Sequence, residues 1–140
     1  MEIRYHKGDY KYILASILTY DTEIVSEGHS LPFCWIDARG VLTIVNGYAW
    51  DGPSGPTFDT KSFMRGSLIH DALYQLLRET GLGGDEDWND VRRYHADLIL
   101  YNVCIEDGMW GWRARWVHRG VRLGGGPSAE VKKRRIYTAP

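Results

Sequence analysis

Two apolar segments with helical spacing, joined by a short glycine-rich connection, constrain the fold of this chain most. The first begins between residues 60 and 62 and runs to about residue 79, and Gly81 ends it. The second runs from about residue 87 to residue 106, and Gly108 follows it. Because the connection is short, we expect the two helices to lie side by side in antiparallel orientation.

Each helix has a predicted apolar face, because apolar residues recur at steps of three and four along both segments. In the first helix this face consists of Leu68, Ile69, Leu73, Leu76 and Leu77. In the second helix it consists of Val91, Tyr94, Leu98, Tyr101 and Ile105.

Three titratable side chains stand inside these apolar segments, namely His70, Asp71 and Asp97. Burying such groups is costly unless they pair or bind a metal, so they are candidates for a functional site. Adjacent residues point about 100° apart on a helix, so His70 and Asp71 cannot serve one another. We expect His70 to meet Asp97, which fixes the tautomer of the imidazole. Asp71 is then expected to face sideways, toward the preceding loop.

This loop is rich in Gly and Pro. Residues 46–60 hold three Gly and two Pro, which exclude a helix or an inner strand, and the loop itself is placed at residues 48–59. The stretch from Trp50 to Gly55 offers backbone carbonyls and the carboxylate of Asp51. Ligand sets made only of oxygen suit Ca²⁺.

The residues before the loop, 1–47, are predicted to form antiparallel strands. Tyr10, Tyr12 and Leu14 alternate with other residues, and segments 33–36 and 41–45 form a hairpin whose turn is closed by a glycine. A third, shorter helix is expected over residues 109–122. Strands followed by helices place the chain in the α+β class.

Length and composition indicate one domain. The chain has 140 residues, of which 44% are hydrophobic and 25% charged, and we place the domain at residues 1–126. The two cysteines, Cys34 and Cys104, are no disulfide framework, and we expect two buried thiols. The sequence shows no signal-peptide pattern and no apolar run near the roughly 20 residues of a membrane span, so we expect no Sec export.

Charge is distributed unevenly. Residues 108–140 carry eight Arg or Lys and one Glu, a net charge of +7, which leaves −8 for residues 1–107 because the whole chain is −1. A basic end on an acidic body indicates either a polyanion or membrane surface as partner, or a tail that is only well solvated. Residues 127–140 are predicted to be a flexible basic tail.

The order of these features resembles two families. The string His-Asp-x-x-Tyr from His70 to Tyr74, the downstream Ala96-Asp97 and the upstream glycine-rich loop resemble secreted phospholipase A2, especially the disulfide-free type of parvoviral capsid proteins. This resemblance covers about residues 46–105. Residues 40–125 also resemble a family of small phage proteins with a domain of unknown function, DUF1353, whose members share a similar Pro-containing loop, a His-Asp helix and an Ala-Asp helix.

The phospholipase A2 resemblance implies a role for each candidate residue. His70 would be the general base that activates water, Asp97 would orient His70, and Tyr74 would brace the pair by hydrogen bonding to a carboxylate. Asp71 would bind Ca²⁺, which would polarise an ester carbonyl. Carbonyls near three loop residues would complete the shell of the ion, those of Trp50, Gly52 and Ser54.

Together the two resemblances imply a phage-type, Ca²⁺-dependent lipid esterase that acts on a phospholipid or membrane surface and is located in the host cytoplasm or the virion. The alternative is a non-enzymatic phage protein, either a virion or tail component or a small anti-defence protein that binds a phage or host protein. In that case the pair of His70 and Asp97 is structural. A transition-metal site that includes His95 is disfavoured, because His95 and Asp97 lie about 200° apart on a helix.

A tryptophan- and arginine-rich segment, residues 110–119, is a second candidate for function. Trp112, Trp116 and Arg119 share one helical stripe. Such a stripe suits a membrane interface or, as a less favoured partner, nucleic acid on which the rings stack. We favour a third interpretation, in which a Trp face packs onto the core and the Arg side chains point outward.

Overall fold

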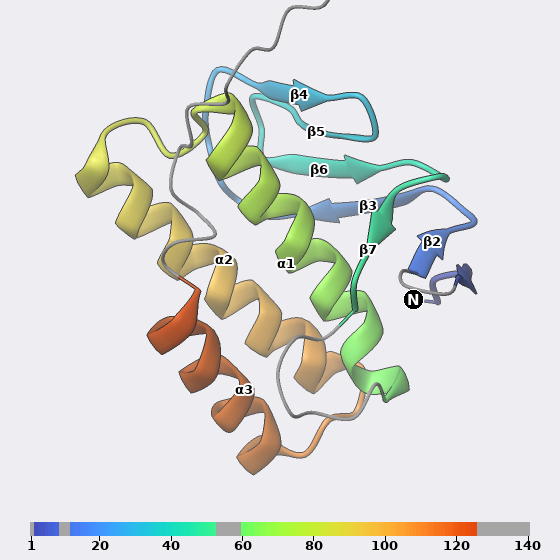
Figure 1. Ribbon diagram of the computed structural model, residues 1–140. Coiled ribbons are helices and arrows are strands. Elements are labelled where there is room, and N and C mark those ends of the chain that lie inside the picture. The colour runs from blue at the N-terminus through green and yellow to red at the C-terminus, as the bar shows by residue number, and fades with distance from the viewer. Residues whose placement is uncertain (1, 9–11, 53–59, 126–140) are drawn as a thin grey trace, which may run out of the picture.

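Short antiparallel strands precede three helices in the computed structural model, which describes residues 2–8, 12–52 and 60–125 (Figure 1). One sheet has the order β1-β2-β7, with β1 (Tyr5–Lys7), β2 (Tyr12–Leu14) and β7 (Ala49–Trp50). The other has the order β3-β6-β5-β4, with β3 (Leu18–Asp21), β6 (Val41–Ile44), β5 (Cys34–Ile36) and β4 (His29–Leu31). The helices are α1 (Lys61–Thr80), α2 (Glu86–Glu106) and the shorter α3 (Gly111–Gly124). The predicted α+β class is confirmed.

The predicted hairpin is formed by β5 and β6. Cys34 pairs with Ile44 in antiparallel register, and both side chains are buried. Gly40 closes the turn at a φ of 93°, and a Cβ there would lie 2.8 Å from the backbone nitrogen of Ile24. Only glycine fits this position without strain, because it tolerates positive φ and has no Cβ.

Strand β7 lies inside the segment predicted to be a loop. Ala49 and Trp50 pair with β2 at the edge of the three-stranded sheet. The glycines and prolines exclude an inner strand, as predicted, but they do not prevent a two-residue strand at an edge.

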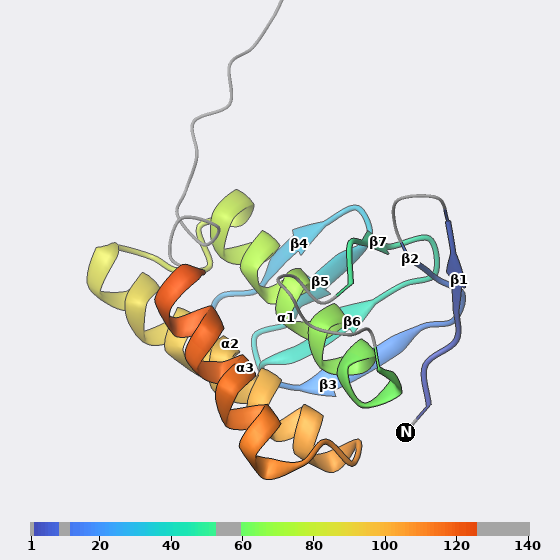
Figure 2. The ribbon, with the colours of Figure 1, turned by 60° about the horizontal axis from the view of Figure 1, so that its bottom comes forward.

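Helix α1 lies between the four-stranded sheet and α2, and α3 packs on α2 (Figures 1 and 2). All five residues of the predicted apolar face of α1 are buried in the main core, which they share with side chains of both sheets. The two cysteines are free and buried, as predicted. None of the helices in the described part of the chain is long and apolar enough to cross a membrane.

Helices α1 and α2 are antiparallel neighbours, as expected. Arg65 on α1 binds Asp107 just after α2, through two bonds of 3.0 and 2.9 Å. Near the other end of the pair, Arg92 on α2 donates to the carbonyl of Leu82. Between these contacts the helices approach closely at Gly66, where a Cβ would lie 2.9 Å from the sulfur of Cys104. This close approach sets the distance between α1 and α2 one turn before His70.

The predicted apolar face of α2 is wrong for four of its five residues, and Tyr101 is the one that packs against the core. Val91, Tyr94, Leu98 and Ile105 are exposed, at 37–56%. The helix instead buries Arg93, Ala96, Asp97, Ile99, Leu100, Val103 and Cys104. The helix is apolar on two sides, and the side with the smaller residues faces α1, where the close approach at Gly66 requires them.

The favoured interpretation of the Trp/Arg segment is also wrong. Helix α3 turns its small residues Ala114 and Val117 inward, where they pack with Phe63, Leu100 and Cys104. Trp110, Trp112 and Trp116 are 54–71% exposed. Small side chains let α3 lie close to α2, and their helical spacing then directs the tryptophans outward.

Candidate functional site

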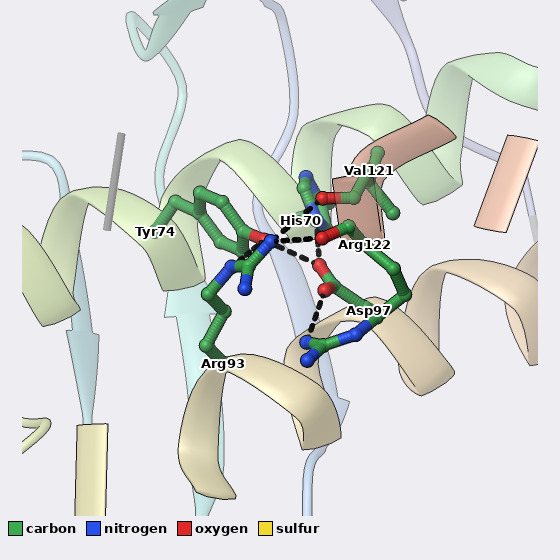
Figure 3. A network of polar contacts seen from close by, with 6 residues as sticks. All are labelled: His70, Tyr74, Arg93, Asp97, Val121 and Arg122. Atoms are coloured by element: carbon green, nitrogen blue, oxygen red, sulfur yellow. Dashed lines mark hydrogen bonds and ion pairs between the residues drawn. The ribbon is translucent and has the colours of Figure 1, made fainter. Parts of the chain in front are cut away.

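Asp97 is the centre of a buried polar network between the three helices (Figure 3). Its Oδ1 accepts hydrogen bonds from Nε2 of His70 at 2.7 Å and from the hydroxyl of Tyr74 at 2.5 Å. Its Oδ2 accepts a hydrogen bond from Nη1 of Arg122, on α3, at 2.8 Å. The structure therefore brings together the three residues predicted as catalytic, His70, Tyr74 and Asp97.

The hydrogen bonds determine the charge of Asp97. Burial alone would raise the pKa of this carboxyl, but hydrogen bonds from His70, Tyr74 and Arg122 outweigh burial and hold the pKa below its usual value. An ionised carboxylate only accepts hydrogen bonds, so Nε2 of His70 must be the donor. In a neutral ring this leaves a lone pair on Nδ1, which is the form that can take a proton.

Tyr74 remains a hydroxyl in this setting. Its burial and its bond to Asp97 raise its pKa. Its ring lies one turn along α1 from the imidazole of His70, with 4.1 Å between the ring centroids. Tyr74 therefore holds Oδ1 of Asp97, the acceptor of the His70 hydrogen bond, and its ring packs against the imidazole.

Two arginines complete the network and were missed by the sequence reasoning. Arg93 on α2 is buried, and its Nε donates to the Tyr74 hydroxyl at 3.1 Å. Its Nη2 donates to the carbonyls of Val121 and Arg122, at 2.9 and 2.8 Å. These carbonyls belong to the last turn of α3, and that of Val121 also accepts a hydrogen bond from the backbone N–H of Gly125, at 2.8 Å. Arg93 thus attaches the end of α3 to the site.

A signal for Arg93 was present in the sequence, and none for Arg122. Arg93 lies four residues before Asp97, so the two share one face of α2. A charged pair on one face of a largely apolar helix indicates a buried polar network. Arg122 comes from another helix, and only the packing of α3 brings it to Asp97.

The network can hold an imidazole in one orientation and in one tautomer. His70 is only 8% exposed, and Asp97 is fully buried. The positive charge of Arg122 compensates the charge of Asp97, which a buried carboxylate requires. These contacts hold the imidazole by its Nε2, which leaves Nδ1 of His70 as the nitrogen that could act as a base.

Asp71 faces away from this network, as its position next to His70 predicts. Burial raises the pKa of Asp71 to about 6, and the nearby Asp51 carboxylate adds to the rise, while His70 and Arg78 oppose it. Asp71 also raises the pKa of Tyr48, after the larger effect of burial. Asp71 and Asp51 therefore lie close enough to interact, as expected for a residue directed toward the loop.

Of the three loop residues predicted to offer carbonyls, the structure describes Trp50 and Gly52. The side chain of Trp50 is buried, and its indole nitrogen donates to the hydroxyl of Ser67 on α1 at 3.2 Å, which attaches β7 to α1. Gly52 is buried with a φ of 78°. Ser54 lies outside the described residues, together with the rest of segment 53–59 and the tail 127–140.

The donor chemistry of Asp71 and Asp51 fits a hard cation. Both offer carboxylate oxygens, and a cation between them would relieve the repulsion that contributes to the raised pKa of Asp71. Within the described residues, no group of three or more His, Cys, Asp or Glu side chains is arranged to hold a metal. If the protein holds Ca²⁺, as the sequence predicts, Asp71 and Asp51 are the two described carboxylates that would bind it.

Replacing Asp71 with Asn is expected to stabilise the protein more at pH 7.5 than at pH 4. The folded-state pKa of about 6 exceeds the ordinary value of 3.8, so the folded state binds this proton more tightly. Stability therefore falls as pH rises from about 4 to 6 and stays lower above that, by about 1–3 kcal/mol. The measurement is the difference in unfolding free energy between Asp71→Asn and wild type at both pH values, in chelator. The same difference at pH 4 and at pH 7.5 would contradict a raised pKa for Asp71 in the folded state.

Comparison with protein-family models, with curated proteins and with solved structures found no match, so the resemblances to phospholipase A2 and to the phage family stay predictions.

Proposed function

We propose that this protein is a Ca²⁺-dependent lipid esterase in which His70 activates water. The observation that carries the proposal is the bond of 2.7 Å between Nε2 of His70 and an ionised, buried Asp97. This bond leaves Nδ1 of the neutral ring as the base. The placement of Asp71 on the next residue of α1, beside Asp51, supports a cation site adjacent to that base.

The proton transfers follow from this arrangement. Nδ1 of His70 takes a proton from water while the water oxygen forms a bond to the carbonyl carbon of the ester. The imidazolium then gives that proton to the oxygen of the leaving alcohol as the carbon–oxygen bond breaks, so the ring returns to its starting form. Asp97 stabilises the transient imidazolium, and Tyr74 and Arg122 hold Asp97 in place. Bound Ca²⁺ would supply Lewis-acid stabilisation of the developing oxyanion.

The ion pair of Arg122 with Asp97 favours a second candidate function. A carboxylate whose charge is already compensated, buried between three helices, is also what a purely structural network requires. The protein would then be a non-enzymatic phage protein that binds a phage or host protein, and the network would only attach α3 to α1 and α2.

Release of fatty acid from phospholipid vesicles, with Ca²⁺ and with chelator, tests the esterase. We expect release by the wild type in Ca²⁺ and a fall of at least about 100-fold in chelator, because the oxyanion would lose its electrostatic partner. A folded protein that releases no fatty acid in either condition would contradict the esterase and support the structural network.

A further inference from the structure

The outward side of α3 carries large apolar side chains beside arginines. We call it the Trp/Arg face and define it by Trp112, Arg115, Trp116, Arg119 and Leu123, together with Trp110, which directly precedes the helix. The four apolar side chains are 54–83% exposed, and both arginines are exposed. Trp110 and Trp112 also contact each other, with ring centroids 6.1 Å apart. Clusters of exposed apolar side chains on one helix are typical of interaction sites.

The arginines of α3 divide into two pairs. Arg122 binds Asp97, while Arg113 donates to the hydroxyl of Thr60 at 2.7 Å and lies over the ring of Phe63. Arg115 and Arg119 form no ion pair with any described residue. The inner pair therefore attaches the helix to the body, and the outer pair leaves positive charge beside the tryptophans.

The charge of this face indicates what it binds. Helix α3 contains four arginines and no acidic residue, whereas residues 1–107 carry a net charge of −8. Two copies of the face would repel each other, so a second copy of this chain is a poor partner. An anionic surface is complementary, because arginines bind lipid phosphates while tryptophans lie at the level of the headgroups.

The apolar side chains favour a bilayer over nucleic acid. Single-stranded nucleic acid is bound in positively charged grooves with stacked rings. The Trp/Arg face is instead the convex outer side of a helix, and it includes Leu123, which is 83% exposed and has no ring for stacking. A helix with Trp and Leu beside Arg suits the plane of a membrane interface.

We propose that α3 docks this protein on the surface of an anionic phospholipid bilayer through the Trp/Arg face. The helix lies in the interface plane, and the site lies directly behind it, because Arg122 of the same helix binds Asp97. This inference rests on the proposed lipid esterase, whose substrate it places in a bilayer. Vesicle binding is measured without hydrolysis, so the two proposals fail separately.

Sedimentation of the full chain with vesicles of ether-linked phosphatidylglycerol and phosphatidylcholine tests this docking, because these lipids have no ester to cleave. We expect binding to mixed vesicles and at least about 10-fold weaker binding to phosphatidylcholine alone. The double variant Trp112→Ala/Trp116→Ala is expected to bind at least about 10-fold less. The double variant Arg115→Gln/Arg119→Gln is expected to lose roughly 20-fold on mixed vesicles.

Trp88→Ala is the matched control, since Trp88 is 57% exposed in the first turn of α2, outside the Trp/Arg face. It is expected to bind like wild type. All replaced side chains are exposed, and a thermal melt of each variant verifies folding. No binding by wild type, or equal binding by wild type and the Trp112→Ala/Trp116→Ala variant, would overturn the proposal. Binding of a single-stranded oligonucleotide without vesicle binding, lost in the same variant, would also overturn it and assign the face to nucleic acid.

Discussion

Replacing Asp97 with Asn is expected to lower the free energy of unfolding by about 3–5 kcal/mol. The Asn amide retains the shape of the side chain, but it removes the only charge that compensates Arg122 among the bonds of this network. Its amide hydrogens would also face the guanidinium of Arg122 or the donors His70 and Tyr74, because all three partners of Asp97 donate. Donors without acceptors in a buried site carry the full desolvation penalty.

Urea unfolding of Asp97→Asn and of wild type measures this loss. Asp90→Asn is the matched control, because Asp90 is an exposed acid on the same helix and should change stability by no more than about 0.5 kcal/mol. The pH dependence adds a second readout. The pKa of Asp97 is lower in the folded state than in the unfolded chain, so its stabilisation is present above about pH 4 and is lost as pH falls further. Equal stability of the two variants would contradict a central role for Asp97.

Replacing His70 with Gln is expected to lower the rate of lipid hydrolysis by about 10²–10⁴-fold, the usual contribution of a general base. The Gln amide can still donate to Oδ1 of Asp97, as Nε2 of His70 does, but it has no basic nitrogen to take a proton as Nδ1 does. Stability should therefore fall by only about 1–2 kcal/mol. His70→Gln should therefore lose most of its activity while it stays folded. If the network were only structural, the variant would lose stability and have no activity to lose.

The initial rate of fatty acid release, at equal concentrations of folded protein, measures this effect. His95→Gln is the matched control, since His95 is a half-buried histidine of α2 that forms none of the bonds around Asp97. It is expected to keep the wild-type rate. Wild-type activity in His70→Gln would remove His70 from the reaction.

The sequence predicted the elements of the site better than their surroundings. The apolar run around His70 predicted both the helix and the buried position of the imidazole, because all five predicted core residues of α1 are buried and α1 is covered on most of its sides. The short connection and the placement of Asp97 near the middle of α2 then predicted the contact between the two side chains. These predictions need only the periodicity of each helix and one short connection, and both can be read from a short stretch of sequence.

Periodicity does not predict which side of α2 or of α3 is buried, since each helix has two plausible apolar sides. On α2 the larger residues, such as Val91 and Tyr94, suggested the core, but the close approach at Gly66 selects the side with Ala96 and Cys104. On α3 the tryptophans suggested the core, but Ala114 and Val117 pack more closely. Arg122 reaches Asp97 only because α3 packs in this orientation. Such choices depend on contacts between distant segments, which periodicity does not encode.

Whether Asp97 orients His70 as a base can be measured without substrate, from the protonation of the His70 ring. Nitrogen-15 spectra of the histidine rings at about pH 8.5 distinguish a protonated from an unprotonated ring nitrogen. We expect one fixed tautomer for His70, with the proton on Nε2 toward Asp97 and a lone pair on Nδ1. His6, which is exposed, provides the reference for a ring in exchange between tautomers. A proton on Nδ1 of His70, or tautomer exchange like that of His6, would show that Asp97 does not orient His70 as a base.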